Sequence, residues 1–137
     1  MATYVIDSWP ILEWLLDKPL AASRFERFLD QAIDADDRLI MSRINYGEVI
    51  YSLAKPVANT RAQALPMDMQ SLPITILSVD DGLVDEAAAL KARYPLSYAD
   101  CFAAALAIRE GGAVVTRDLE FLKLRDLGVL TLEWMGA

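Results

Sequence analysis

The sequence predicts an α/β sandwich, in which helices cover both faces of a mainly parallel sheet of about five strands. Short apolar runs, partly β-branched, alternate along the chain with segments of helical period, and this alternation is typical of α/β folds. The apolar runs are nearly continuous, as expected of strands that are covered on both faces. At 137 residues the chain is long enough for one core, so we expect a single domain over residues 1–137.

Both kinds of element can be placed along the chain. The expected strands lie at residues 4–6, 38–42, 74–78, 113–116 and 129–132. The expected helices lie at residues 10–16, 21–35, 43–54, 81–93 and 97–110. Ser8 is the expected N-cap of the first helix, and Gly111-Gly112 ends the last one. Segment 55–73 contains three prolines, so any helix there is expected to be short or broken.

The composition excludes several classes of site. The chain contains no histidine, so it has no Ser-His-Asp triad, no Cys-His pair and no zinc site with a histidine ligand. Its single cysteine, Cys101, cannot form an internal disulfide. No apolar run approaches the roughly 18–20 residues that span a bilayer, and the N-terminus lacks the features of a signal peptide. We therefore expect a cytoplasmic protein without a membrane anchor.

The charge balance bears on the partners of the protein. With 13 basic and 20 acidic residues, the formal net charge is −7. A protein that binds nucleic acid by neutralising phosphates usually carries the opposite sign. A nuclease whose acidic site is loaded with divalent metal remains possible, because the cations invert the local charge. The same charge also suits a protein that docks a basic partner.

Four acidic residues adjoin apolar runs, where a carboxylate is costly to bury unless it is paired, hydrogen-bonded or bound to a cation. They are Asp7, Glu48, Asp100 and Asp118. Asp7 and Asp118 follow predicted strands, and parallel sheets place their binding sites at the carboxyl ends of strands. Asp100 has the strongest setting, because small and apolar residues surround it on every face of its helix. Together they indicate one site for a hard cation with oxygen ligands.

Each acid also has an ordinary structural interpretation. Asp7 and Asp118 are common residues in turns and at helix N-termini. Glu48 suits a solvated helix position, since glutamate is a good helix former. Asp100 would be favoured by the helix dipole in the first turn of a helix whose N-cap is Ser97. A shared site is therefore a hypothesis about the four residues together.

Four stretches resemble the acidic motifs of PIN-domain nucleases. They are Tyr4-Val-Ile-Asp-Ser, Asn45-Tyr-Gly-Glu-Val-Ile-Tyr, Leu96-Ser-Tyr-Ala-Asp-Cys-Phe-Ala-Ala-Ala-Leu-Ala and Val114-Val-Thr-Arg-Asp-Leu-Glu-Phe. Their order and the length of the chain resemble VapC-type toxins of bacterial type II toxin–antitoxin pairs. The resemblance extends from residue 3 to about residue 132.

The resemblance implies a metal-dependent endoribonuclease that hydrolyses RNA with water activated by Mg²⁺ or Mn²⁺. It implies that the ion is surrounded by Asp7, Glu48, Asp100 and Asp118, and that the hydroxyls of Ser8 and Thr116 support the site. It also implies a five-stranded parallel α/β/α sandwich, a homodimer, and a small antitoxin protein as partner. Two features depart from the family pattern: Trp9-Pro10 replaces small residues after the first acid, and segment 55–73 looks short and broken by proline.

Two other interpretations compete with the nuclease. A catalytically inactive PIN-like domain that binds a protein partner would keep the fold without the activity. A phosphotransfer receiver or an Asp-x-Asp phosphatase would need a second acid beside Asp7, which the sequence Asp7-Ser8-Trp9 lacks. In the nuclease interpretation, Arg43 and Arg117 are candidate RNA contacts because they flank the acidic motifs.

Overall fold

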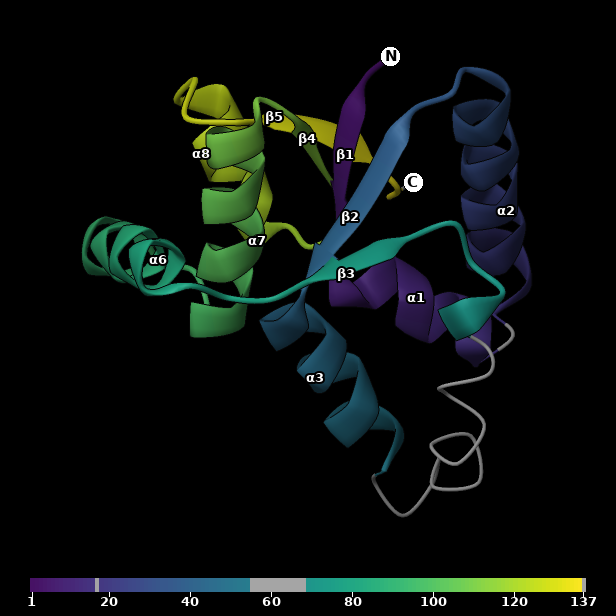
Figure 1. Ribbon diagram of the computed structural model, residues 1–137, viewed down its shortest axis with the longest axis horizontal. Helices are drawn as coiled ribbons and strands as arrows, with labels where there is room; N and C mark the ends of the chain where they lie inside the picture. The colour runs from purple at the N-terminus through teal and green to yellow at the C-terminus, as the bar shows by residue number, and fades with distance from the viewer. Residues whose placement is uncertain (17, 55–68, 137) are drawn as a thin grey trace.

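One parallel sheet organises the computed structural model, which describes residues 1–16, 18–54 and 69–136 (Figure 1). Its order within these ranges is β3-β2-β1-β4-β5. The strands are β1 (Thr3–Ile6), β2 (Arg38–Ser42), β3 (Thr75–Leu77), β4 (Ala113–Thr116) and β5 (Thr131–Trp134). All neighbouring strands are parallel, and each connection therefore crosses a face of the sheet.

The strand order reverses at the centre of the sheet. The chain begins in β1, adds β2 and β3 on one side, and later adds β4 and β5 on the other. Ile6 of β1 lies opposite Val115 of β4, and the backbone N–H of Asp7 donates to the carbonyl of Val115 at 3.0 Å. The crevice at such a reversal is where open α/β sheets bind ligands, and Asp7 and Thr116 lie at this point.

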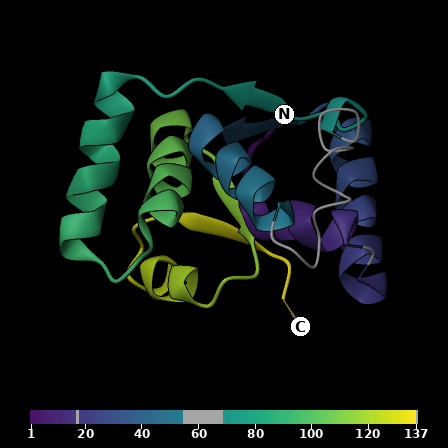
Figure 2. The same ribbon diagram turned by 90° about the horizontal axis from the view of Figure 1, so that it is seen from below.

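Helices cover both faces of the sheet and complete a three-layer sandwich. They are α1 (Ser8–Leu15), α2 (Pro19–Asp34), α3 (Arg43–Leu53), α6 (Asp81–Arg93), α7 (Tyr98–Glu110) and α8 (Glu120–Asp126). Figures 1 and 2 show α1 and α2 on one side of the sheet and α6, α7 and α8 on the other. Helix α3 starts directly at the end of β2. The predicted fold class is therefore confirmed.

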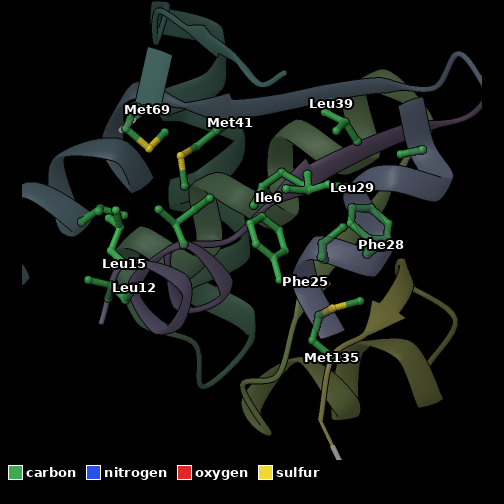
Figure 3. Close-up of a cluster of buried hydrophobic side chains, with 14 of the residues drawn as sticks. Ile6, Leu12, Leu15, Phe25, Phe28, Leu29, Leu39, Met41, Met69 and Met135 are labelled. Atoms are coloured by element: carbon green, nitrogen blue, oxygen red, sulfur yellow. The ribbon is translucent and has the colours of Figure 1, made fainter. Parts of the chain in front are cut away.

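Alternate residues of each strand pack into different cores. Val5 and Val114 point to a core that α6, α7 and α8 share. Their neighbours Ile6 and Val115 point to the opposite core with α1 and α2, where Figure 3 shows Ile6 beside Phe25 of α2. This arrangement follows from the two-residue period of a strand. It explains why neighbouring positions of the central strands, such as Val5 and Ile6 or Val114 and Val115, are both apolar.

The last strand does not begin where the sequence predicts it. The expected range was 129–132, but β5 spans Thr131–Trp134. Helix α8 is followed by Gly128 with φ of 73°, and the N–H of Val129 donates to the carbonyl of Leu124. Val129 and Leu130 thus lie in the connection between α8 and β5 and pack against the core that α6, α7 and α8 share. Their apolar character reflects burial rather than strand pairing.

The helix ends agree with the sequence in part. Ser97 caps α7 and Gly111 ends it with φ of 65°, as predicted. The prediction that Ser8 is an N-cap is wrong, because Asp7 occupies the cap position and Ser8 is the first helical residue. Helix α2 begins two residues earlier than expected, at Pro19, whose fixed φ suits the first position of a helix.

Two further expectations concern the rest of the chain. Most of segment 55–73 lies outside the described residues, so the prediction of a broken helix there is not tested. No helix in the described ranges is both long and apolar enough to cross a membrane.

Candidate metal centre

Asp7 is held in place where β1 turns into α1. Its side chain is fully buried. One carboxylate oxygen accepts a hydrogen bond from the N–H of Ser8 at 2.8 Å, and the other accepts one from the Thr116 hydroxyl at 2.7 Å. Asp7 is thus the N-cap of α1, as in its ordinary structural interpretation, and it is also a buried carboxylate at the strand ends. The cap and the neighbouring strand fix the orientation of its carboxylate.

Glu48 reaches the same place from α3. Its Oε1 accepts a hydrogen bond from the Ser8 hydroxyl at 2.6 Å, and its carboxylate also interacts with the hydroxyl of Tyr51. The side chain is half-buried, which differs from the solvated helix position considered for it. Ser8 therefore connects the first two acids, one through its N–H and the other through its hydroxyl.

Asp100 stands in the first turn of α7 and is only 4% exposed. Its N–H donates to the Ser97 hydroxyl at 3.2 Å, which is the predicted cap. Helix α7 is tied to α3 through Asn45, a buried residue whose amide donates to the carbonyl of Ala99 at 3.0 Å. This contact holds the helices of Glu48 and Asp100 side by side.

Asp118 lies just after β4 and is half-buried. Its N–H donates to the Thr116 hydroxyl at 3.0 Å, so Thr116 bridges the segments of Asp7 and Asp118. Its carboxylate accepts from the N–H of Glu120 at 3.0 Å. The helix that follows begins at Glu120, and Leu119 rather than Asp118 is its cap residue.

These acids form two groups that share one member. Carboxylate oxygens of Asp7, Glu48 and Asp100 lie within 4.8 Å of one another, and so do those of Asp100, Asp118 and Glu120. The structure therefore brings all four sequence-predicted acids into one region. Glu120 was not singled out from the sequence. Its only signal was its position two residues after Asp118, in the first turn of a helix, where an exposed glutamate is ordinary.

Collecting these carboxylates changes their protonation. Burial raises the pKa of Asp7 to about 7, although hydrogen bonds from Thr116 and Ser8 oppose this, and the charges of Glu48 and Asp118 raise it further. Burial, followed by the negative charges around it, raises the pKa of Asp100 to about 9. Without a cation, these surroundings therefore disfavour the ionised forms of Asp7 and Asp100. A bound cation would favour the ionised carboxylates and lower both pKa values.

The donor set fits a hard divalent cation. The three acids of the more buried group offer oxygen atoms from the β1–α1 connection, from α3 and from α7. Oxygen ligands from a few carboxylates are the set that Mg²⁺ prefers, with water and substrate phosphate completing the shell. A soft metal would instead require thiolate or imidazole ligands. On this chemistry Asp7, Glu48 and Asp100 fit Mg²⁺ or Mn²⁺.

Two pockets flank the acids, and Trp9 lines both. One holds about 330 Å³ and is lined by Ser8, Trp9, Leu12, Leu16, Glu48, Tyr51 and Ser52. The other holds about 360 Å³ and is lined by Trp9, Arg117, Asp118 and Leu119. The guanidinium of Arg117 forms an ion pair with Glu13 and lies 5.2 Å from the centroid of the Trp9 ring. Arg43, the other candidate RNA contact, lies over the ring of Tyr46 and lines neither pocket.

Comparisons with solved structures show the same fold in several toxin–antitoxin proteins. VapBC2 from Rickettsia felis, bound to a promoter DNA fragment, superposes with a TM-score of 0.75 at 17% identity, over 96% of this chain and 97% of that one. DNA-bound VapBC from Salmonella typhimurium superposes with a TM-score of 0.73 at 20% identity, over 98% of this chain and 99% of that one. VapC20 from Mycobacterium tuberculosis is described as a toxin that cleaves the sarcin–ricin loop. It superposes with a TM-score of 0.71 at 15% identity, over 88% of this chain and 93% of that one.

The family itself is identified from the sequence match. No curated protein sequence matches the chain. The family model of the PIN domain, however, matches residues 4–127. This span contains all four acids, the strands β2, β3 and β4, and β1 apart from its first residue. The chain therefore belongs to the PIN domain family.

Proposed function

We propose that the protein is a metal-dependent endoribonuclease and the toxin of a toxin–antitoxin pair. The observation that carries the proposal is the buried group of Asp7, Glu48 and Asp100, whose carboxylate oxygens lie within 4.8 Å of one another at the strand reversal. Family membership supports the nuclease activity. The described activity of the similar Mycobacterium tuberculosis toxin supports RNA as the substrate.

In this proposal the four acids have different tasks. Asp7, Glu48 and Asp100 hold Mg²⁺ or Mn²⁺, and Asp118 lies at the edge of the same site. When bound, the ion would lower the pKa of water and stabilise negative charge on the phosphate as a Lewis acid. Ser8 and Thr116 keep the carboxylate oxygens of Glu48 and Asp7 in position through hydrogen bonds of 2.6 and 2.7 Å.

The charge of the chain suggests that metal binds before RNA. The net charge of −7 and the acidic site both repel a phosphodiester while the site is empty. Loading with divalent cations inverts the local sign, so RNA binding should follow metal binding. The absence of histidine is consistent with a reaction that does not use imidazole as the general base.

Partners follow from the same comparison. The similar structures from Rickettsia felis and Salmonella typhimurium are VapBC complexes. We propose that this chain likewise binds a small antitoxin protein and forms a homodimer. A short neighbouring reading frame that encodes a DNA-binding protein would support the pairing.

The proposal is tested by incubating the purified chain with tRNA and rRNA in Mg²⁺, Mn²⁺ or EDTA. We expect internal cleavage with either metal and none with EDTA. Intact RNA in every condition, together with binding of a protein partner, would instead favour the inactive interaction domain.

Replacement of Thr116 by Val should lower RNA cleavage without unfolding the protein. Valine keeps the shape of threonine but removes the donor to Asp7 and the acceptor for the N–H of Asp118. Loss of such an outer partner of a metal ligand costs about 10- to 100-fold in activity. The measurement is kcat/KM for RNA cleavage. Thr116→Ser should retain most of the activity, and Thr131→Val, on the exposed part of β5, should retain all of it.

A further inference from the structure

Trp9 has a fixed position beside the candidate metal centre. It lies two residues after Asp7, in the first turn of α1. The residue between them, Ser8, donates hydrogen bonds to the carboxylates of both Asp7 and Glu48. Trp9 is 42% exposed, so part of its indole is open to solvent beside these residues. Its backbone thus cannot shift without moving the acids, while its ring remains accessible.

The pocket on one side of this ring includes one of the four acids, Glu48. We call it the Trp9 pocket, and its lining is Ser8, Trp9, Leu12, Leu16, Glu48, Tyr51 and Ser52. Ser8 and Glu48 belong both to this pocket and to the acidic site. Two exposed aromatic side chains line it, Trp9 from α1 and Tyr51 from α3. Whatever fills the Trp9 pocket therefore lies beside the carboxylate of Glu48.

Arg117 supports the indole from the second pocket. Its guanidinium lies over the Trp9 ring and is itself paired with Glu13. Arg117 lines the pocket of Asp118 and Leu119 but not the Trp9 pocket. A cation over the ring adds an attraction that favours one ring orientation. The indole is thus held by Arg117 without Arg117 occupying the Trp9 pocket.

We propose that the Trp9 pocket binds one unpaired nucleobase of the RNA substrate, stacked on Trp9, next to the phosphate that is cleaved. This inference rests on the proposed function. Proteins recognise single-stranded RNA by stacking bases on aromatic side chains and by hydrogen bonds to the base edges. Leu12 and Leu16 give the pocket apolar walls, while Ser52 and Ser8 offer hydroxyls. A base here would be joined through its ribose to a phosphate near the acids, which favours a nucleotide over a peptide side chain.

The test uses an RNA of 12 nucleotides that spans a bond cut in the assay above. A series of these oligonucleotides carries one abasic residue at each successive position around that bond. In the wild-type protein, we expect one abasic position to lower kcat/KM about tenfold, since stacking of one base on an aromatic ring contributes on that order. Abasic residues at the other positions should have smaller effects.

Two substitutions of Trp9 separate stacking from simple apolar contact. Trp9→Leu removes the ring, so cleavage of the intact RNA should fall about tenfold and the sensitive abasic position should have no further effect. Trp9→Phe keeps a ring and should retain the abasic penalty. Leu20→Ala, at an exposed position of α2 that lines neither pocket, is the matched control and should behave as wild type. Melting temperatures establish that each variant is folded.

The outcomes distinguish this inference from the proposed function. Equal cleavage of intact and abasic RNA at every position by the wild type, or an undiminished abasic penalty in Trp9→Leu, would overturn the base pocket while leaving the nuclease intact. A chain that cuts no RNA with either metal would overturn both. If the chain cuts no RNA and the Trp9 pocket binds a protein partner, the pocket is part of a protein interaction surface.

Discussion

Asp100→Asn is expected to reduce metal-dependent RNA cleavage by more than about 100-fold. Asp100 is the acid shared by both carboxylate groups, and the amide keeps its shape while removing the negative charge that a cation requires. The loss should exceed the roughly 10- to 100-fold effect of changing an outer partner of a metal ligand. The measurement is kcat/KM with saturating Mn²⁺, and Asp7→Asn should behave in the same way.

A matched control uses an acid outside the site. Asp85 is exposed on α6, and Asp85→Asn should cleave RNA as the wild type does. The two site variants should also keep a cooperative melting transition. If Asp100→Asn remains as active as Asp85→Asn, the acidic group is not the catalytic centre.

The stability of the metal-free protein should fall as the pH rises from about 4 to about 9. In the unfolded chain Asp7 and Asp100 titrate near the ordinary value of 3.8, but in the folded protein their pKa values are raised to about 7 and about 9. The folded state therefore binds more protons than the unfolded state over this interval. Stabilisation from protonation is fully present below about pH 4 and is lost as the pH rises through the folded pKa values.

Added Mn²⁺ should reverse this loss, and most strongly at high pH. The metal needs ionised carboxylates, so its affinity rises with pH. At 100 times Kd, a ligand stabilises the folded state by about 2.7 kcal/mol, or on the order of 8 °C in melting temperature for a chain of this size. The measurement is the melting temperature at pH 6, 7 and 8, with EDTA and with Mn²⁺. A shift that is absent at every pH would contradict metal binding, and Asp100→Asn should weaken both the pH slope and the Mn²⁺ shift.

The fold could be predicted from the sequence because its signals are local. Apolar runs such as 113–116 read as strands on their own, and Ser97 and Gly111 mark both ends of one helix. The error at the last strand arose where tertiary contacts decide. Val129 looked like the start of a strand, but it packs against the core from a connection.

The site could be predicted only in part, because its acids depend on distant residues. The burial of Asp100 follows from the apolar helix around it. The environment of Glu48, by contrast, is set by a hydroxyl 40 positions away, that of Ser8. Asn45 joins α3 to α7 across 54 positions, and Glu120 joins the acids through Asp100, which lies on another helix, α7. No local pattern carries such information.

The most direct test of a metal centre at these carboxylates is anomalous diffraction from crystals soaked in Mn²⁺. We expect a strong peak among Asp7, Glu48 and Asp100, with carboxylate oxygens at roughly 2.0–2.6 Å, the range for oxygen-bound hard cations. Asp100→Asn crystals treated in the same way should lose most of the peak. Crystals in which Mn²⁺ binds elsewhere, or leaves these three carboxylates without a peak, would contradict the proposed centre.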